Sequence, residues 1–408
     1  MKICIIGLGY IGLPTALLLA RENEVFGVDL KEDVVAKIND KVLPFKEPGL
    51  EEMLRTSSLT AGVKPRTADA FIICVPTPFD KEIRMADLHY VRSAAESIVP
   101  FLSKGNIVIV ESTVSPGTCV KVVAPILERS GLKVGKDFYL AHCPERAIPG
   151  NTLNEMVNND RIIGGIDKTS AAICCELYSK FVKGQLLTTD ITTAEYVKLV
   201  ENTYRDTNIA LANELAVIAE DLGVDVWEAI GLANRHPRVK ILKPGPGVGG
   251  HCIAVDPWFL TEDITNSKII SVAREINDNM PAYVLRKVKA VVKGIESPKI
   301  TVFGVAYKGN VDDARETPAL KFIRLAEKEG YTVSAYDPLV TRFDYPLSSL
   351  GDAIRNTDCI VILTDHDLFR KLNYDEVLGS ARNRNIVDSR NILSAGGNYH
   401  LVTLGKTA

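Results

Sequence analysis

The chain has 408 residues, which is too many for one hydrophobic core and predicts two or three domains. Its formal net charge of −3 excludes a global basic field that would attract nucleic acid, so an anionic ligand requires local clusters of Lys and Arg. No apolar run approaches the roughly 18 residues of a membrane span. The eight cysteines form no CxxC pair, so we expect a reduced, cytoplasmic protein with no membrane or nucleic-acid partner and no metal.

Residues 1–190 alternate short β-rich runs with helical patterns. Such alternation predicts βαβ units around a mostly parallel sheet, and therefore an N-terminal α/β domain. The apolar runs that predict strands lie at 2–6, 25–28, 71–75, 107–110 and 138–141, and helical patterns between them include 14–21 and 91–102.

Residues 191–295 change character and predict a central helical domain. Residues 192–222 carry apolar side chains near the helical period, so we expect one long helix capped by Thr192 or Thr193. An exposed helix of this length suits a dimer seam. Further helices are predicted at 226–233 and 268–293, on either side of a Gly/Pro-rich loop at 244–250.

Residues 296–408 return to the α/β pattern and predict a C-terminal domain. Its expected strands lie at 300–305, 333–336, 359–363 and 385–387, with a helix at 319–329. The predicted fold class is thus α/β, with two doubly wound domains joined by a central helical domain.

The segment Gly7-Leu8-Gly9-Tyr10-Ile11-Gly12 is a G-x-G-x-x-G motif between the first predicted strand and a helix. Glycines there permit a tight turn and close approach of backbone to a pyrophosphate, which characterises Rossmann-like domains. Asp29 ends the second strand, where a carboxylate accepts hydrogen bonds from ribose hydroxyls and repels a 2′-phosphate. We therefore expect NAD bound by Gly9, Tyr10, Ile11, Gly12 and Asp29, the alternative being a glycine-rich turn and a capping acid.

Two more loops follow predicted strands of the same domain, at the sheet edge where ligands bind. One contains Pro76 and Thr77, and the other, at 111–118, contains Thr113. Their hydroxyl groups favour cofactor contacts. The alternative is that both are plain turns, with Ser115 or Thr118 as a helix cap.

The loop from Gly245 to Pro257 is the most informative stretch, because Cys252 lies there among dense glycines. We interpret the glycines as allowing close approach of a ligand, since no core packing role explains them. An accessible thiol on such a loop is a candidate nucleophile, and Asp256 follows one helical turn later.

The long predicted helix offers polar partners for such a nucleophile. Lys198 and Asn202 are four residues apart and share one face, so together they can stabilise an oxyanion. Arg205 lies further along the same helix. Glu145, in Pro144-Glu145-Arg146, follows a strand and is a candidate general base. The alternative is an ordinary solvated face.

Taken together, these motifs resemble the UDP-glucose/GDP-mannose dehydrogenase family in order and over nearly the whole chain. The resemblance includes the opening glycine motif, the Glu-Ser-Thr loop, Pro-Glu-Arg, the Lys198/Asn202 helix, Gly-Gly-His-Cys, and Phe303-Gly304-Val305-Ala306-Tyr307-Lys308. The glucose branch typically has Gly-Gly-Ser-Cys and a Lys before the Asp. Here Ala254-Val255 precede Asp256, and the segment is most similar to the branch that oxidises UDP-N-acetyl-D-mannosamine.

The resemblance implies a four-electron oxidation of the sugar C6 hydroxyl to a carboxylate with two NAD. Lys198, with Asp256 and a water, would manage the alcohol proton. Cys252 would form a thiohemiacetal and then a thioester, and Glu145 would activate the hydrolytic water. Asn202 and Lys198 would hold the oxyanion, with Thr113 near the reacting centre.

The resemblance also implies a UDP-sugar site in the C-terminal domain, a homodimer or larger homo-oligomer, and a role in surface polysaccharide or glycan synthesis. Lys308 would contact both cofactor and substrate. The implied substrate contacts are Glu145, Arg146, Lys198, Asn202, Arg205, His236, Arg238, Gly249, Lys308, Arg315 and Arg390.

Other functions remain open at this stage. Another nucleotide sugar, such as UDP-N-acetylglucosamine or UDP-glucose, would keep the mechanism. A single-step hydroxyacid dehydrogenase shares the first domain and the Lys/Asn helix, but it needs no nucleophilic Cys. Tyr283 and Lys287 fit the Y-x-x-x-K pattern of short-chain dehydrogenases, far from the first glycine motif. A non-enzymatic NAD sensor would have no use for Cys252, Lys198 and Glu145.

Overall fold

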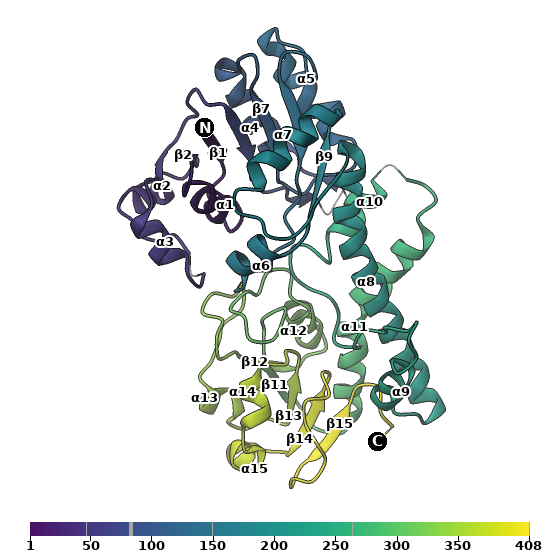
Figure 1. Ribbon diagram of the computed structural model, residues 1–408. Helices are drawn as coiled ribbons and strands as arrows, with labels where there is room; N and C mark the ends of the chain where they lie inside the picture. Colours follow the sequence, from purple (N-terminus) through teal and green to yellow (C-terminus); the bar gives the residue numbers. More distant parts are fainter. Residues whose placement is uncertain (46, 81–84, 149, 263, 408) are drawn as a thin grey trace. The chain divides into compact units, whose positions relative to one another are not determined.

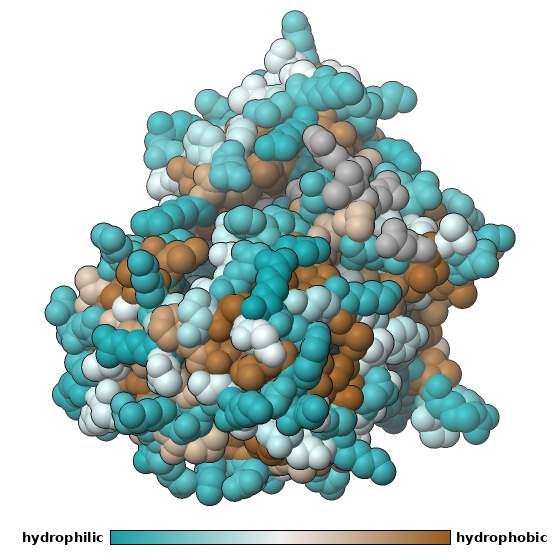
Figure 2. Space-filling model, turned by 90° about the horizontal axis from the view of Figure 1, so that it is seen from above, coloured by the Kyte–Doolittle hydropathy of each residue, from teal (hydrophilic) through white to brown (hydrophobic). Residues whose placement is uncertain are grey.

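The computed structural model describes residues 1–45, 47–80, 85–148, 150–262 and 264–407 (Figure 1). The chain divides into two compact units, Met1–Glu201 with Trp258–Glu262, and Asn202–Pro257 with Asp263–Ala408. Within the described ranges, none of the helices combines the length and the apolarity needed to cross a membrane. The face drawn in Figure 2 accordingly mixes hydrophilic and hydrophobic side chains.

The first unit is built on a sheet whose order, over the described residues, is β10-β9-β8-β7-β4-β1-β2-β3. From β3 to β8 neighbouring strands are parallel, and β9 then runs antiparallel to β8. The six parallel strands have the Rossmann order, in which the chain adds strands first on one side of β1 and then on the other. The strands are β1 Lys2–Ile6, β2 Glu24–Val28, β3 Thr60–Gly62, β4 Ala70–Ile73, β7 Ile107–Val110, β8 Tyr139–His142, β9 Arg161–Gly165 and β10 Leu186–Asp190, with a separate hairpin of β5 Phe79–Asp80 and β6 Met85–Ala86.

Both faces of this sheet are covered by helices, as its continuous apolar strands require. In β1, Ile3 and Ile5 join one hydrophobic core, and Cys4 and Ile6 join the other. Helices α1, α3 and α7 pack on the first side, and α4 and α5 on the second (Figure 1). The helices are α1 Gly12–Leu19, α2 Glu32–Asn39, α3 Leu50–Thr56, α4 His89–Ile98, α5 Ala124–Leu127, α6 Thr152–Asn158 and α7 Lys168–Tyr178.

The long predicted helix is α8, Ile191–Leu222, which begins in the first unit and ends in the second. The predicted Thr cap is wrong. Asp190, at the end of β10, accepts hydrogen bonds from the backbone N–H of Thr193 at 2.9 Å and from its hydroxyl. Gly223 ends the helix with φ of +75°. The helices that follow are α9 Val226–Ala233, α10 Asp256–Thr261 and α11 Lys268–Val291.

The second unit contains a parallel sheet of order β12-β11-β13-β14-β15 in the described chain. Numbered within the unit, this is the 2-1-3-4-5 order of a doubly wound fold. The hydrophobic core on one face contains α11 and α12, and the core on the other contains α14 and α15. The elements are β11 Lys299–Phe303, α12 Pro318–Lys328, β12 Thr332–Tyr336, α13 Leu350–Ile354, β13 Cys359–Ile362, α14 Asp367–Lys371, α15 Tyr374–Val377, β14 Asn385–Asp388 and β15 His400–Thr403.

The predicted α/β class, with two doubly wound sheets and a long helix, is therefore confirmed. The finer division at 190/191 and 295/296 stays a prediction.

Candidate functional site

The glycine motif forms the turn between β1 and α1. Gly7 has φ of +95°, and a Cβ there would lie 2.5 Å from the carbonyl oxygen of Cys74. A Cβ on Gly12 would lie 1.8 Å from the carbonyl oxygen of Gly7, so the chain itself requires both glycines. A Cβ on Gly9 would meet no described atom within 4 Å. Gly9 therefore leaves open space at the N-terminal end of α1, where a pyrophosphate binds in such turns.

Asp29 fits the ribose end of a dinucleotide. Its half-buried carboxylate accepts hydrogen bonds from the backbone N–H of Leu8 and of Lys31, each at 3.0 Å. Two donors leave lone pairs for ribose hydroxyls and hold the negative charge beside the glycine turn. Exposed Tyr10, in the same turn, packs against the Phe45 ring at 4.2 Å. These residues fit NAD.

The two predicted cofactor loops are tied together. The Thr77 hydroxyl donates to the carbonyl of Thr113 at 2.7 Å, and the Ser112 hydroxyl donates to the carbonyl of Val75 at 2.7 Å. The cap of the second loop is Glu195 of α8, rather than Ser115 or Thr118. Its buried carboxylate accepts hydrogen bonds from the backbone N–H groups of Gly117 and Cys119. Pro76 lies exposed in the first loop.

Lys198 follows Glu195 by three residues on α8 and is half-buried. Its charge adds to the effect of burial, which lowers the pKa of His142 to about 3. Because His142 ends β8, this coupling places Lys198 near the carboxyl end of that strand.

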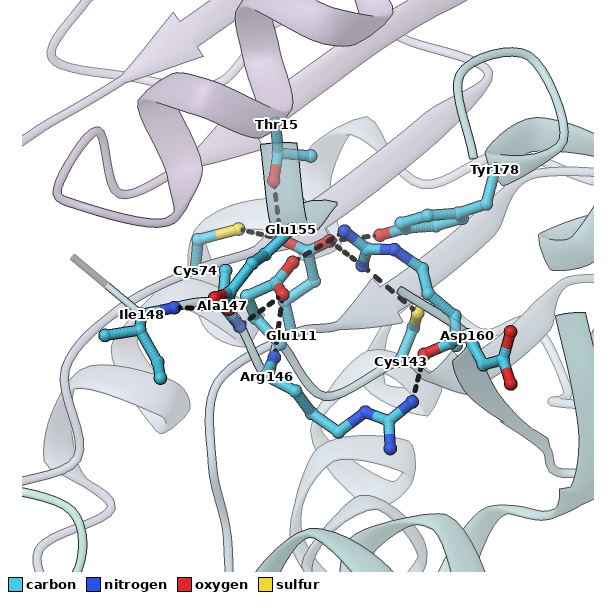
Figure 3. Close-up of polar contacts among 12 residues, drawn as sticks. Thr15, Cys74, Glu111, Cys143, Arg146, Ala147, Ile148, Glu155, Asp160 and Tyr178 are labelled. Atoms are coloured by element: carbon cyan, nitrogen blue, oxygen red, sulfur yellow. Dashed lines mark hydrogen bonds and ion pairs between the residues drawn. The ribbon is translucent and has the colours of Figure 1, made fainter. Parts of the chain in front are cut away.

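Glu145, just after β8, is the carboxylate end of a buried ion pair. Its Oε2 lies 2.6 Å from Nη2 of Arg161, and its Oε1 accepts hydrogen bonds from the backbone N–H of Arg146 at 2.7 Å and of Ala147 at 2.8 Å. Arg161 in turn lies 3.8 Å from Glu111. Figure 3 shows Cys74, Thr15 and Tyr178 around Glu111. Sequence reasoning missed Arg161, the first residue of β9.

Arg146 is held by the chain itself. Its Nη1 pairs with Glu201 of α8 at 2.7 Å, and its Nη2 donates to the carbonyl of Asp160. The side chain therefore joins the loop after β8 to the long helix. Its expected contact with substrate stays a prediction.

The glycines before Cys252 lie against protein, which corrects our interpretation of them. A Cβ on Gly247 would lie 2.8 Å from the carbonyl oxygen of Asn277, and one on Gly249 would lie 2.8 Å from that of Glu316. A Cβ on Gly250 would lie 3.1 Å from the ring of Tyr307. These glycines thus allow close packing within the second unit, and the argument for Cys252 rests on its neighbours.

Three predicted catalytic residues are brought together in the second unit. The amide of Asn202 donates to Oδ2 of Asp256 at 2.6 Å, and Asp256 is 3% exposed. The backbone N–H of Asp256 donates to the carbonyl of Cys252 at 2.8 Å, in the turn that starts α10. The thiol-bearing residue, a carboxylate and an amide therefore share one corner of the unit.

The loop after β11 reaches the same corner. The backbone N–H of Gly250 donates to the carbonyl of Arg315 at 3.1 Å. Burial raises the pKa of the Tyr307 hydroxyl, with the charges of Asp313 and Cys252 adding to the effect and that of Arg205 opposing it. The guanidinium of Arg315 is held by Asp313 through two contacts of 2.9 and 2.6 Å.

The remaining predicted basic residues differ in setting. Nε of Arg390 donates to the carbonyl of Leu363 at 3.0 Å. Its Nη1 lies 2.8 Å from the position that a Cβ on Gly245 would take. Burial lowers the pKa of this guanidinium. Lys308 is exposed beside Tyr307. His236 and Arg238 are exposed after α9 and contact each other at 3.4 Å.

Three family models match the chain in succession. They are the NAD binding domain at 1–182, the central domain at 192–279 and the UDP binding domain at 301–395 of the UDP-glucose/GDP-mannose dehydrogenase family.

Individual proteins match over nearly their whole length. The UDP-N-acetyl-D-mannosamine dehydrogenase of Methanococcus maripaludis is 52% identical, covering 96% of this chain and 93% of that protein. An NDP-N-acetyl-D-galactosaminuronic acid dehydrogenase from Ralstonia solanacearum is 43% identical, covering 96% of each. The solved UDP-D-ManNAc dehydrogenase of Pyrococcus horikoshii is 42% identical, with a TM-score of 0.94 over 100% of this chain and 99% of that one.

Proposed function

Because the chain belongs to the UDP-glucose/GDP-mannose dehydrogenase family, we propose that it oxidises the C6 hydroxyl of UDP-N-acetyl-D-mannosamine to a carboxylate with NAD. The observation that carries this proposal is the 52% identity to a UDP-N-acetyl-D-mannosamine dehydrogenase over 405 residues. The Cys252–Asp256–Asn202 corner supplies the groups that such chemistry needs.

Gly9, Gly12 and Asp29 would hold NAD, with Tyr10, Ile11, Pro76, Thr77, Thr113 and Lys308 as further contacts. When bound, NAD would accept a hydride in each of the two oxidations. The chain has to handle the protons and the aldehyde.

In the first oxidation, the C6 hydroxyl loses a proton as its carbon loses a hydride. We assign the proton transfer to Lys198, with Asp256 and a water. The amide of Asn202 would donate a hydrogen bond to the developing alkoxide. Its position is set by the 2.6 Å hydrogen bond to Asp256.

In the second oxidation, the thiolate of Cys252 would add to the aldehyde carbon and form a thiohemiacetal. Loss of a hydride then leaves a thioester on sulfur. Water, oriented by Glu145 with Thr113 nearby, would attack the thioester carbon, release the carboxylate and regenerate the thiol. Covalent capture keeps the aldehyde from diffusing away between the two steps.

The anionic diphosphate needs cations, and the second unit supplies them locally despite the net charge of −3. We propose Lys308, Arg315, Arg390 and Arg205 as contacts with the UDP-sugar, with His236, Arg238, Arg146 and Gly249 as further candidates. Guanidinium groups suit this role because they bind phosphate oxygens in pairs.

We further propose a cytoplasmic homodimer or larger homo-oligomer that serves polysaccharide or glycan synthesis. Large apolar side chains lie exposed along α8 at intervals of seven or eight residues, which puts them on one side of the helix. They are Tyr196 at 51% exposure, Tyr204 at 58%, Leu211 at 47% and Ile218 at 46%. A second copy of the chain would cover them. Light scattering of Leu211→Lys beside the unaltered protein tests this, and an unchanged mass would contradict it.

The test of function is the NADH yield at completion with limiting UDP-N-acetyl-D-mannosamine. Parallel reactions contain UDP-N-acetylglucosamine, UDP-N-acetylgalactosamine, UDP-glucose or GDP-mannose. Two NADH per UDP-N-acetyl-D-mannosamine, and little from the others, is the expected result. Two NADH from a different sugar would keep the mechanism and change the substrate, whereas one NADH would remove the thioester.

The matched variant for this test is Cys252→Ala. It should form no acid, while NAD still protects the protein against thermal unfolding. Acid formation at the normal rate would contradict a covalent mechanism.

A further inference from the structure

Arg161 lies between two buried carboxylates, only one of which has a role in the proposed reaction. Its Nη2 is 2.6 Å from Glu145, and its Nη1 is 3.8 Å from Glu111. The side chains of Arg161, Glu145 and Glu111 are 4%, 8% and 0% exposed. Two anions thus share one cation out of water, and moving either contact changes the field at the other.

Glu111 is anchored by side chains from α1, from the residue after β4 and from α7. Its Oε2 accepts hydrogen bonds from the hydroxyl of Thr15 on α1 and from the thiol of Cys74 after β4, each at 3.0 Å. Its Oε1 accepts one from Tyr178 of α7. Burial raises the pKa of the Glu111 carboxyl, and Arg161 opposes that effect. Figure 3 shows these groups around Glu111.

Arg161 itself has little room to move. Its guanidinium carbon lies 5.0 Å from the ring centre of Tyr178 and 5.5 Å from that of Phe181, and Nη1 contacts the Cys143 sulfur at 3.7 Å. The two rings and the sulfur limit the orientation of the guanidinium plane. Glu145 therefore receives its ion pair from a guanidinium in a set position.

We propose that Arg161 is a positioning residue that orients the Glu145 carboxylate for thioester hydrolysis, and that Glu111 sets how strongly Arg161 acts on it. The proposal rests on the proposed function, in which Glu145 orients the hydrolytic water. Glu111 competes with Glu145 for the guanidinium, so the charge of Glu111 reduces the share of the Arg161 charge that Glu145 receives. Neutralising Arg161 removes a positive charge 2.6 Å from the Glu145 carboxylate, and neutralising Glu111 removes the anion that competes for that charge.

Among the described residues, the other titratable or charged groups around Arg161 and Glu145 include Cys74, Cys143, Cys174, Tyr178 and Arg146. Burial raises the pKa of the Cys74 thiol and of the Tyr178 hydroxyl well above their ordinary values. Neither group ionises between pH 5 and 9. A change in the pH profile over that range therefore reports on the carboxylates.

The experiment measures how fast the acyl group leaves Cys252, by intact mass during single turnover with NAD and UDP-N-acetyl-D-mannosamine, from pH 5 to 9. Arg161→Gln and Glu111→Gln are compared with the unaltered enzyme. Arg129→Gln is the matched control, because Arg129 pairs with Glu96 at 3.0 Å on the surface.

The acid limb of the release rate should move to higher pH in Arg161→Gln and to lower pH in Glu111→Gln, and stay in place in Arg129→Gln. Release at pH 7 should slow about 10²-fold in Arg161→Gln, which is the usual cost of a misplaced catalytic group. The first hydride transfer should keep its rate, since Glu145 has no part in it.

The proposal would be overturned if the acid limb of the release rate stays in place, or moves in the same direction in both variants. If Arg161→Gln does not fold, Glu111→Gln decides: a limb at lower pH supports the proposal, and any other result overturns it. An unaltered enzyme that never acylates Cys252 would refute the proposed function and the positioning role together. Acylation with unmoved limbs would refute the positioning role only.

Discussion

Replacing His142 by Leu should make the first unit less sensitive to acid. His142 is fully buried at the end of β8, and within the described chain neither ring nitrogen makes a hydrogen bond of ordinary geometry. Burial lowers its pKa from the ordinary 6.5 to about 3, with Lys198 adding to the effect. The folded protein thus keeps the ring neutral while the unfolded chain takes up a proton below pH 6.5. Stability from the neutral ring is complete above pH 6.5 and is lost as the pH falls towards 3.

The loss between pH 7 and pH 5 is about 2 kcal/mol for one group with these two pKa values. For a unit of some 200 residues that is a decrease in Tm of about 4–8 °C, which His142→Leu should escape. At pH 7 the variant should be as stable as the parent or more so, because two unpartnered nitrogens are replaced by carbon.

Scanning calorimetry of both proteins at half-unit steps of pH gives the difference directly, since all other titrating groups cancel. His89→Leu is the control at an exposed histidine. A difference in Tm between parent and His142→Leu that stays within about 1 °C from pH 7 to pH 5 would refute the reasoning.

Three further predictions concern binding and turnover. Gly9→Ala should keep the Tm and raise the KM for NAD about tenfold or more, because its Cβ would enter the space for the pyrophosphate. Gly12→Ala should lower the Tm, because its Cβ would collide with the chain, and equal Tm losses in the two variants would contradict this. Asp29→Ser should reduce the preference for NAD over NADP, measured as the ratio of kcat/KM values, about tenfold, and an unchanged ratio would argue against a ribose contact. Gly249→Ala would place a Cβ 2.8 Å from a carbonyl oxygen, so the loop must shift and kcat should fall about 10²-fold, while Gly231→Ala, with no described atom within 4 Å, should not change it.

The elements that sequence reasoning predicted best are those whose signal is local. The strand at 107–110 is a continuous apolar run buried on both faces, and it was predicted with its observed bounds. Helix α9 was predicted at 226–233 as observed, where Asp225 caps its first turn. Strands β9, β10 and β15 were missed. Each of them contains only two consecutive large apolar residues, so the sequence shows no continuous apolar run there. Pairing with the neighbouring strands stabilises them instead.

The candidate site shows the same limit. The turn at Gly9 and Gly12 and the acid at Asp29 follow a spacing that one βαβ unit dictates, so they were predictable. Arg161 carries no local signal, because its partners are brought to it by the sheet. The glycines before Cys252 were misinterpreted for a related reason. The atoms that exclude their Cβ belong to α11 and to the loop after β11, which the sequence pattern does not connect with them.

Each of the two sheets has an Asp after its second strand that binds the turn after its first strand, and the two Asp residues differ in burial. Asp29 follows β2 and accepts a hydrogen bond from the N–H of Leu8 after β1. Asp337 follows β12 and accepts hydrogen bonds from the N–H groups of Val305 and Ala306 after β11. Asp337 also accepts from the backbone after β12 and contacts His366 at 3.1 Å. Against the effect of burial, these contacts lower its pKa to about 2. The lone pairs of the Asp337 carboxylate are occupied by these contacts. Asp337 therefore stabilises the turn and cannot accept hydrogen bonds from a ribose. Half-buried Asp29 has two donors and room for more, which assigns the dinucleotide to the first sheet.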